Sequence, residues 1–506
     1  MTLIPRRLQL PSIALLIFIT VTSAQAEPID IGSRRELFVD DFLIDTLSGK
    51  VSLQLHKPQI REVAMKFDKP WEGNTSGYPT VMYDGTLYRM IYRGHRMTWE
   101  SGKLLMANSP VVCYAESTDG IHWTRPELNL HKWVGKDRDK LSSPTANNIV
   151  WPGSPYTGTF VPFDDQNPDC IPTERFKAVG GNHKVGLHLF TSPDAIHWSK
   201  RDKPIFTQGA LDSMNTIFWD TERKQYTLYF RTVRDRLRSI DVSYSPDLLN
   251  WTEPVPLQYG NSPPQQMYTN GVLPYYRAPH ILVGFPTRYT ARPLSPRLAN
   301  LPPRELRQKL GDAYGRVASD LSDGLFMSSR DGVTFHRWDE AFIRPAEENP
   351  DAPQNWMYGD NYQSYGLFPT TNKQGRKEIS FLVSHGYWQE YKSRVARYSI
   401  RPDGFVSLHA KYAGGECTTK PFTFKGSRLS VNFATSAAGS IQVEVLDSNR
   451  QAIPGFQLAD CQTIVGNNTD QVVHWNDASL KSLAGHTIRL RFILKDADLF
   501  AFQFID

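Results

Sequence analysis

Short apolar and aromatic runs, separated by polar turns, recur along most of the chain and predict β-strands. Residues 87–93 (Leu-Tyr-Arg-Met-Ile-Tyr-Arg) and 226–231 (Tyr-Thr-Leu-Tyr-Phe-Arg) are two examples. Runs of this length that are rich in aromatic and β-branched residues are typical of strands. After about residue 415 the pattern becomes a regular alternation of apolar and polar residues, as in residues 440–447 and 487–494.

Four of the runs end in the same turn signal, Ser-x-Asp with an aromatic residue four positions after the aspartate. The copies occupy residues 117–123, 192–198, 245–251 and 329–335. In such a turn the Asp side chain accepts hydrogen bonds from nearby backbone N–H groups, and the aromatic ring packs against a sheet. Repeated four-stranded units of this kind predict a β-propeller, so we assign the aspartate of each copy a structural role.

Five segments carry this strand-and-turn pattern, and we therefore predict five blades. They are residues 70–123, 147–198, 211–251, 267–335 and 355–408. Residues 29–41 form a further predicted strand, which we expect to complete the last blade and close the ring. The fourth segment contains a Pro- and Arg-rich insertion at residues 291–310, and we expect its later part to be a short helix.

The predicted fold class is all-β: a five-bladed β-propeller over residues 27–414, followed by a C-terminal β-sandwich over residues 415–506. A chain of 506 residues is too long for one ordinary core, which agrees with two domains. We expect the sandwich to be an accessory module that packs against the propeller, and not a second catalytic centre.

The first 26 residues have the pattern of a secretory signal peptide. Arg6-Arg7 precede an apolar run at residues 13–21, and Ala24-Gln-Ala26 forms a cleavage site. We therefore expect a secreted or periplasmic protein. No later run reaches the roughly 18 apolar residues of a membrane span, so we expect no membrane anchor. Four cysteines are too few to form a disulfide framework; Cys417 and Cys461 either pair or are buried thiols.

Charge and composition limit the kinds of partner that we expect the protein to bind. The net charge is +5 on 506 residues, with no Lys/Arg run suited to a phosphate backbone, so nucleic acid is not an expected partner. Aromatic residues make up 12% of the chain, which suits both sugar stacking and blade packing. His183, His188 and His197 are too irregularly spaced for a metal site, and we expect no metal and no cofactor. The sequence predicts no particular oligomeric state.

The first strands of all blades meet at one end of a propeller channel, so acids just before them are candidate catalytic groups. These acids are Glu72, Asp165, Asp212 and Asp360. Glycoside hydrolysis needs two carboxyl groups, one protonated and one ionised, and crowding of carboxylates keeps one of them protonated. Any one of these acids is also an ordinary turn former.

Aromatic, amide and basic residues near the same strand ends are candidate substrate-binding groups. They are Trp71, Asn74, Arg93, Arg231, Tyr268, Asn270, Arg288, His385 and Trp388. The cations among them either bind a carboxylated or sulfated sugar or neutralise the acids, and the second arrangement is the less costly one inside a polar channel.

Several longer segments resemble exported bacterial proteins related to glycoside hydrolase family 32. They are residues 35–42, 165–180, 268–270 with 277–288, and 484–492. The resemblance implies a five-bladed propeller related to families 32, 43 and 68, followed by a β-sandwich. It also implies that Glu72 is the nucleophile or base, Asp165 an auxiliary acid and Asp212 the general acid. The family motifs themselves are absent, with Trp71-Glu72-Gly-Asn74 at the place of the first, so fructan cleavage is not implied.

The leading hypothesis is an exported glycoside hydrolase that cleaves a poly- or oligosaccharide with channel-lining carboxyl groups. One alternative is a propeller that binds carbohydrate without cleaving it. A second alternative is a sialidase-like hydrolase, which would need three arginines on one channel face and a tyrosine nucleophile, so that Arg93, Arg231 and Arg288 would have to meet.

Overall fold

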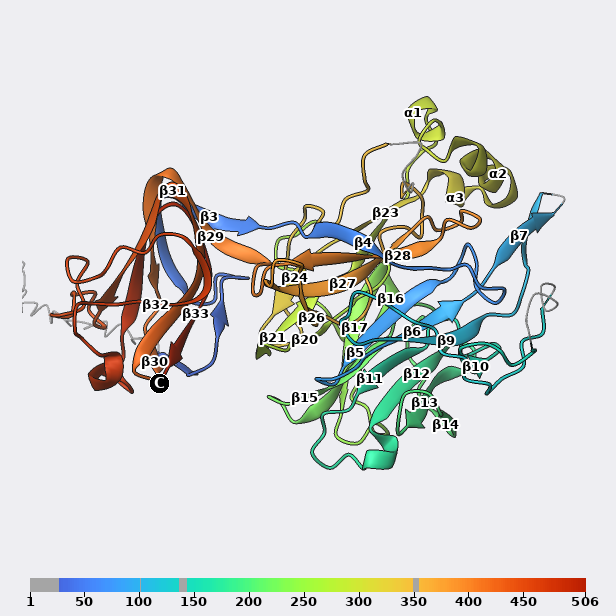
Figure 1. Cartoon of the computed structure of the whole chain (residues 1–506), viewed down its shortest axis with the longest axis horizontal. Helices are drawn as coiled ribbons and strands as arrows, with labels where there is room; N and C mark the ends of the chain where they lie inside the picture. Colours follow the sequence, from blue (N-terminus) through green and yellow to red (C-terminus); the bar gives the residue numbers. More distant parts are fainter. Residues whose placement is uncertain (1–26, 101, 136–142, 349–354) are drawn as a thin grey trace, which may run out of the picture.

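A computed structural model describes residues 27–100, 102–135, 143–348 and 355–506 of the chain. The predicted signal peptide, residues 1–26, lies outside the described residues. Figure 1 shows two bodies side by side, a larger one that contains most of the strands and a smaller one built around the C-terminal strands.

The larger body contains five antiparallel sheets of four strands each. Blade one has β5 (Gly77–Tyr83), β6 (Tyr88–Gly94), β9 (Val111–Ser117) and β10 (Ile149–Pro152). Blade two has β11 (Val161–Asp164), β12 (Phe176–Asn182), β13 (Gly186–Ser192) and β14 (Ser199–Phe206). Blade three has β15 (Thr216–Asp220), β16 (Gln225–Arg234), β17 (Leu237–Ser245) and β18 (Val255–Pro256). Blade four has β20 (Leu273–Tyr275), β21 (Ala278–Gly284), β24 (Met327–Ser329) and β25 (Phe335–Arg337). Blade five has β26 (Phe368–Thr371), β27 (Lys377–His385), β28 (Arg394–Ile400) and β4 (Gln59–Lys66).

The first strands of the blades lie around a common axis, which confirms the predicted five-bladed propeller. Strand β5 contacts β11 and β26, and β15 contacts β11 and β20. One predicted boundary is wrong, because residues 149–152 form the outer strand of blade one and do not begin blade two.

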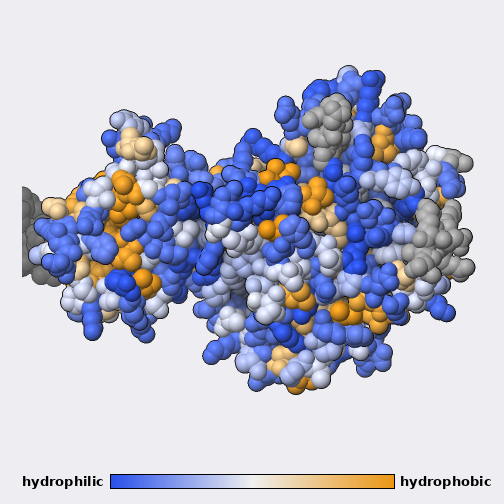
Figure 2. Space-filling view, viewed as in Figure 1, coloured by the Kyte–Doolittle hydropathy of each residue, from blue (hydrophilic) through white to orange (hydrophobic). Residues whose placement is uncertain are grey.

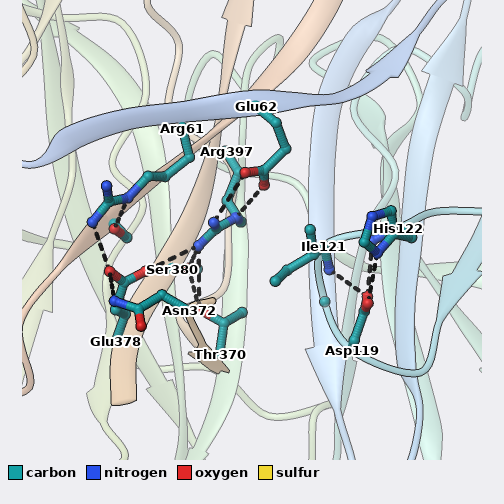
Figure 3. Close-up of polar contacts among 12 residues, drawn as sticks. Arg61, Glu62, Asp119, Ile121, His122, Thr370, Asn372, Glu378, Ser380 and Arg397 are labelled. Atoms are coloured by element: carbon teal, nitrogen blue, oxygen red, sulfur yellow. Dashed lines mark hydrogen bonds and ion pairs between the residues drawn. The ribbon is translucent and has the colours of Figure 1, made fainter. Parts of the chain in front are cut away.

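The repeated turn has the predicted structure in all four copies. Asp119 accepts hydrogen bonds from the backbone N–H groups of Ile121 and His122, both at 2.8 Å, as Figure 3 shows. The backbone N–H of Asn250 in the third copy lowers the pKa of Asp247 to about 2. These aspartates therefore hold turns together.

The ring is closed by a different strand from the predicted one. Strand β4 pairs antiparallel with β28 and completes blade five, whereas residues 29–32 and 36–37 pair with strands of the other body. Ion pairs reinforce this closure: Arg61 binds Glu378 at 2.6 Å, and Arg397 binds Glu62 at 2.5 Å (Figure 3). Arg397 also donates to Ser380 Oγ at 2.8 Å, so one buried guanidinium joins three strands of the blade.

The smaller body is a β-sandwich with strands from both ends of the chain. Its main sheet has the order β3 (Ile44–Leu55), β29 (Val406–Thr419), β33 (Arg489–Ile505), β31 (Arg428–Leu446) and β32 (Asn467–Val472). Strand β2 (Glu36–Leu37) pairs with β33, and β1 (Ile29–Gly32) pairs with β30 (Phe422–Phe424). Residues 29–55, which the sequence places in the propeller, are thus hydrogen-bonded to the C-terminal strands; the division at residue 414 itself stays a prediction.

Most of the remaining elements lie in long loops of the propeller. Strands β7 (Met97–Glu100) and β8 (Lys103–Met106) form a hairpin, and β19 (Gln266–Met267), β22 (Thr287–Thr290) and β23 (Leu321–Gly324) form a small sheet. Helix α1 (Pro296–Ala299) lies within the predicted insertion, α2 (Arg304–Tyr314) begins in its later part, and α3 (Arg316–Ser319) follows it. Among the described residues, 3₁₀ turns lie at Pro172–Glu174 and Leu480–Leu483. No described helix is long and apolar enough to cross a membrane.

The four cysteines are unpaired. Cys417 and Cys461 are both buried in the apolar core of the sandwich. Of the two alternatives that the sequence leaves open, the structure has the buried thiols.

Replacement of Arg397 by alanine tests the closure of the ring. The change leaves the buried Glu378 with one cation fewer and removes the tie to β4, so we expect it to lower the free energy of unfolding by about 3 kcal/mol or more. Chemical denaturation measures this loss. Arg201→Ala is the control, because Arg201 and Glu174 form an exposed pair worth at most about 1 kcal/mol. Equal losses in the two variants would contradict a role of Arg397 in closure.

Candidate functional site

Tyrosines crowd together at the end of the channel where the first strands begin. The tyrosine cluster consists of Tyr78, Tyr268, Tyr289, Tyr358 and Tyr362. The ring of Tyr268 lies 5.4 Å from Tyr362, 5.5 Å from Tyr358 and 5.9 Å from Tyr289 between centroids, and Tyr78 lies 5.9 Å from Tyr362. The cluster therefore joins residues from three blades and their loops at one place.

Local backbone irregularity aims Tyr78 into the cluster. Its φ is +52°, and the pairing of β5 with β6 shifts register between Gly77 and Thr80. A bulge of this kind redirects a side chain away from the ordinary alternation of a strand, and bulges are common beside functional sites.

Four arginines lie over the rings of the cluster. Arg93 lies 4.9 Å from the ring centroid of Tyr78, and Arg231 lies 4.6 Å from that of Tyr268. Two further arginines join them, Arg238 near the start of β17 and Arg316 at the start of helix α3. Arg238 lies 4.4 Å from the ring of Tyr289, and Arg316 lies 5.2 Å from the ring of Tyr358. Stacking on aromatic faces holds the four guanidinium groups at the channel end.

Several polar atoms at this place are buried without a partner among the described residues. They are Nε of Arg93, Nε of Arg316 and the hydroxyl of Tyr362. Buried donors are nearly always satisfied in native proteins, so an unpaired set indicates a bound water or ligand. Burial raises the pKa of Tyr78 and Tyr362, so both stay protonated and are available as hydrogen-bond donors.

The opening at the cluster is narrow. A pocket of about 10 Å³, roughly the space of one water molecule, is lined by Gly77, Tyr78, Tyr358, Gly359, Tyr362, Ser384 and Tyr387. Arg93 Nη2 donates to the hydroxyl of Tyr387 at 2.9 Å beside it. A single polar group fits this pocket, whereas a whole sugar ring would have to lie over its mouth.

Asp212 is the only one of the four predicted acids with an exposed carboxylate at this site. Its side chain is 51% exposed, and it accepts from Nε of Arg231 at 3.0 Å. A second carboxylate that the sequence does not single out contacts the cluster through Tyr289. Asp320, 3% exposed, accepts from the hydroxyl of Tyr289, and burial raises its pKa to about 6 against the opposing effect of Arg238.

The other three predicted acids are buried in hydrogen-bond networks. Glu72 pairs with Arg125 at 3.0 Å and accepts from Tyr92 at 2.6 Å; burial raises its pKa. Asp360 accepts from the backbone N–H groups of Tyr387 at 2.8 Å and Met357 at 3.1 Å, and burial raises its pKa as well. Both lie beneath the channel end and not on it, and their catalytic roles stay predictions.

Asp165 lies at the other end of its blade. The sequence predicts it ahead of the first strand of blade two, taken there to begin at Arg175. That interpretation is wrong, because residues 161–164 are the first strand and Asp165 follows it. Asp165 accepts from Lys177 Nζ at 2.6 Å and from the hydroxyl of Tyr226 at 2.8 Å, between blades two and three.

Of the predicted binding residues, Arg93, Arg231 and Tyr268 belong to the channel site, and Trp388 supports it. Trp388 Nε1 donates to the backbone carbonyl of Tyr358 at 2.8 Å. Asn74 is buried, and its Oδ1 accepts a hydrogen bond from the backbone N–H of Met97 at 3.0 Å. This bond anchors the β7–β8 hairpin.

The other predicted binding residues have partners elsewhere. Trp71 donates to Asn148 at 2.8 Å, and Asn270 donates to the carbonyl of Met214 at 2.8 Å. His385 is buried beside the hydroxyl of Tyr398 at 3.0 Å, and burial lowers its pKa to about 4. Arg288 binds Asp323 at 2.8 Å and lines a separate pocket of about 750 Å³ that also contains Trp356.

Sequence reasoning missed the loop residues of the site. Arg238 follows the turn between β16 and β17, and Arg316 and Asp320 belong to the helical insertion. The sequence does contain a signal for the tyrosines. Tyr358 and Tyr362 flank the predicted acid Asp360 in one short segment, and Tyr78 begins a predicted strand. Nothing in the spacing of the arginines or of Asp320 indicates that they meet these rings.

In comparisons with known proteins, this chain is similar to solved structures and to no protein-family model or curated sequence. One similar structure is an N-acetylgalactosamine deacetylase from F. plautii in complex with blood group B trisaccharide, with 13% identity, a TM-score of 0.41, and 68% of this chain and 94% of that chain covered. A second is a glycosyl hydrolase from Bacteroides ovatus, with 16% identity, a TM-score of 0.39, and 73% and 94% covered.

A third similar structure comes from work on the mannoside phosphorylase family that contains glycoside hydrolases targeting β-1,2-mannosidic linkages in Candida mannan. It has 15% identity, a TM-score of 0.39, and 72% of this chain and 96% of that chain covered. Similarities this low assign neither a family nor a substrate. The relation to family 32 stays a prediction.

Replacement of Asp165 and of Asp212 by alanine tests which of the two aspartates stabilises the fold and which lies exposed at the channel end. Asp165→Ala leaves the buried Lys177 charge without its carboxylate, so we expect a loss of about 3 kcal/mol or more in the free energy of unfolding. Asp212→Ala removes a half-exposed carboxylate from Arg231, which keeps its stacking on Tyr268, and we expect a clearly smaller loss. Denaturant titration of both variants checks the order, and the reverse order would contradict these positions.

Proposed function

We propose that the protein is an exported, carbohydrate-active hydrolase of the glycosidase type, and that its channel end binds an acidic sugar. The observation that carries the proposal is the meeting of four arginines, five tyrosines and the exposed Asp212 at one end of the channel. Aromatic faces suit sugar rings, and arginine forks suit carboxylates and sulfates.

The charge distribution indicates that the arginines bind an acidic sugar and do not serve only to neutralise the acids of the channel. Arg231 has Asp212 as its partner. Among the described residues, Arg93, in contrast, donates only to neutral oxygens, those of Tyr387, Thr75 and Gly158. A guanidinium with neutral partners and an unpaired Nε keeps its capacity to bind an anion.

Two carboxyl groups at the cluster supply the chemistry of glycoside hydrolysis. Asp320 is the candidate general acid, since its raised pKa keeps it protonated up to about pH 6. It would donate its proton to the departing glycosidic oxygen, while Asp212 attacks the anomeric carbon or removes a proton from the attacking water. Addition of water across the glycosidic bond then restores both groups.

A tyrosine nucleophile has less support. The sialidase-like alternative needs an ionised or readily ionised tyrosine, but burial raises the pKa of Tyr78, Tyr358 and Tyr362. Arg288, one of the three arginines that this alternative names, lines a different pocket. Binding without cleavage remains the other candidate and is an outcome of the experiment below.

The proposed export is supported only by the sequence of residues 1–26. A basic start, an apolar run and an Ala-x-Ala site are the elements of a cleaved leader. Cell fractionation with sequencing of the mature N-terminus tests it, and an intact Met1 in the cytosolic fraction would contradict it.

Amide substitution of the two acids tests the hydrolase. We expect Asp320→Asn and Asp212→Asn each to lower the release of reducing sugar from uronate-containing or sulfated glycans by at least about 100-fold. The exposed Asp202→Asn variant is the control. Activity of the unmodified protein should fall as the pH rises above about 6, because Asp320 then loses its proton.

Two results would overturn this assignment. Full activity in both variants would remove Asp212 and Asp320 from the reaction. Tight binding of the glycan panel by the unmodified protein without any release of reducing sugar would favour the non-catalytic alternative.

A further inference from the structure

A polar groove lies at the junction of the two bodies, away from the channel site. It has a volume of about 680 Å³, within the range of ligand-binding pockets. One wall comes from blade five and its closing strand, the other from the sandwich. The lining includes Arg61, Arg376 and Lys377 on the propeller side and Asn467 to Thr469 and Phe500 on the sandwich side. Figure 2 shows hydrophilic surface over this junction.

We propose that this groove is a second binding site, for an acidic polysaccharide that carries repeated carboxylate or sulfate groups. The site binds and does not cleave, and the proposal is independent of the hydrolase proposed for the channel end. Three properties of the groove lead to it: unpaired positive charge, a fixed desolvated arginine, and hydroxyl-binding amides.

Positive charge exceeds negative charge along the groove. The lining cations are Lys57, Arg61, Arg376, Lys377 and Arg401, and the lining carboxylate is that of Glu378. Glu378 is already engaged by Arg61 and by the buried Arg397, as Figure 3 shows. The exposed Lys57, Arg376 and Lys377 make no side-chain hydrogen bond or ion pair with the described residues.

Arg401 is a fixed cation whose hydrogen-bond acceptors among the described residues are neutral oxygens. Its Nη atoms donate to Oδ1 of Asn467 at 2.8 Å and of Asn432 at 2.7 Å, and its guanidinium lies 4.3 Å from the ring centroid of Phe500. Its Nε is buried and unpaired among the described residues. Burial lowers its pKa to about 10 against the opposing effect of Asp403 and Asp498, and it stays charged at neutral pH. Such a group favours an anion nearby.

The rest of the lining suits sugar hydroxyls better than nucleotides. Asn372, Ser399, Asn468 and Thr469 offer amide and hydroxyl groups along both walls. Phe500 is buried under Arg401, so the groove presents no open aromatic face on which a base could stack. The lining cations come from separate segments: Lys57 and Arg61 from the closing strand and the residues before it, Arg376 and Lys377 from the start of β27, and Arg401 from the end of β28. We therefore infer a ligand with several spaced charges and not a single phosphate.

Charge reversal at the exposed hairpin between β26 and β27 tests the site. The double variant Arg376→Glu/Lys377→Glu changes two groove cations that have no structural partner. Lys373→Glu is the matched control, because Lys373 is exposed in the same turn but does not line the groove. Affinity electrophoresis of the full chain in polygalacturonate, a sulfated polysaccharide or neutral dextran measures binding at two salt concentrations.

We expect the double variant to weaken binding to both acidic polysaccharides by at least about tenfold, and Lys373→Glu to change it less than about twofold. Binding of the unmodified protein should weaken with salt and be absent for dextran. Cleavage of short soluble substrates should be unchanged in the double variant, which separates this site from the channel end. We expect the same difference in binding between the double variant and Lys373→Glu when both also carry Asp212→Asn. The binding test therefore does not depend on whether the channel end hydrolyses glycans.

Three results would overturn the proposal. They are equal binding of the double variant and the unmodified protein, equal binding of dextran and the acidic polysaccharides, and a groove-dependent affinity that is greater for single-stranded DNA than for either acidic polysaccharide.

Discussion

The pairing of β4 with β28 is the interaction on which the rest of the structure depends. It ties an N-terminal strand to the last blade and so closes the propeller, because β4 covers the outer edge of β28. The neighbouring strands along the chain, β3 and β29, continue as a pair into the sandwich, as Figure 1 shows. One two-stranded ribbon therefore closes the ring and joins the two bodies.

This ribbon also fixes the junction. Because β3 and β29 both run from blade five into the sandwich sheet, the two bodies are connected twice, and residues 29–55 complete the sandwich from the other end of the chain. Arg61 and Arg397 bind carboxylates across the closing strand. The groove proposed for acidic polysaccharide lies beside these contacts, so a ligand there would touch both bodies at their most constrained point.

Electrostatics divides the acids of the propeller into two groups. Glu72, Asp165 and Asp360 are buried and satisfied by cations, hydroxyls or backbone N–H groups, and their loss would cost stability because buried partners would be left unpaired. Asp212 is half exposed beside Arg231, whereas Asp320 is buried beside Tyr289 and burial raises its pKa to about 6. These two are the carboxyl groups to which the proposal gives the chemistry of the channel end, and in that proposal the stacked arginines supply the binding charge.

The sequence by itself determined the class of fold. Strand patterns and the four repeated turns are local signals, since an Asp side chain that binds the next backbone N–H groups needs only its own turn, and these predicted a five-bladed all-β propeller followed by a sandwich. It also predicted a site at the channel end, and of the residues that it named, Arg93, Arg231, Tyr268 and Asp212 lie there. Tertiary structure alone decided which strand closes the ring, where Asp165 lies, and that Arg238, Arg316 and Asp320 join the tyrosines. Those facts depend on contacts between residues far apart in the chain, and the energy of such contacts comes from burial and stacking that leave no periodic trace in the sequence.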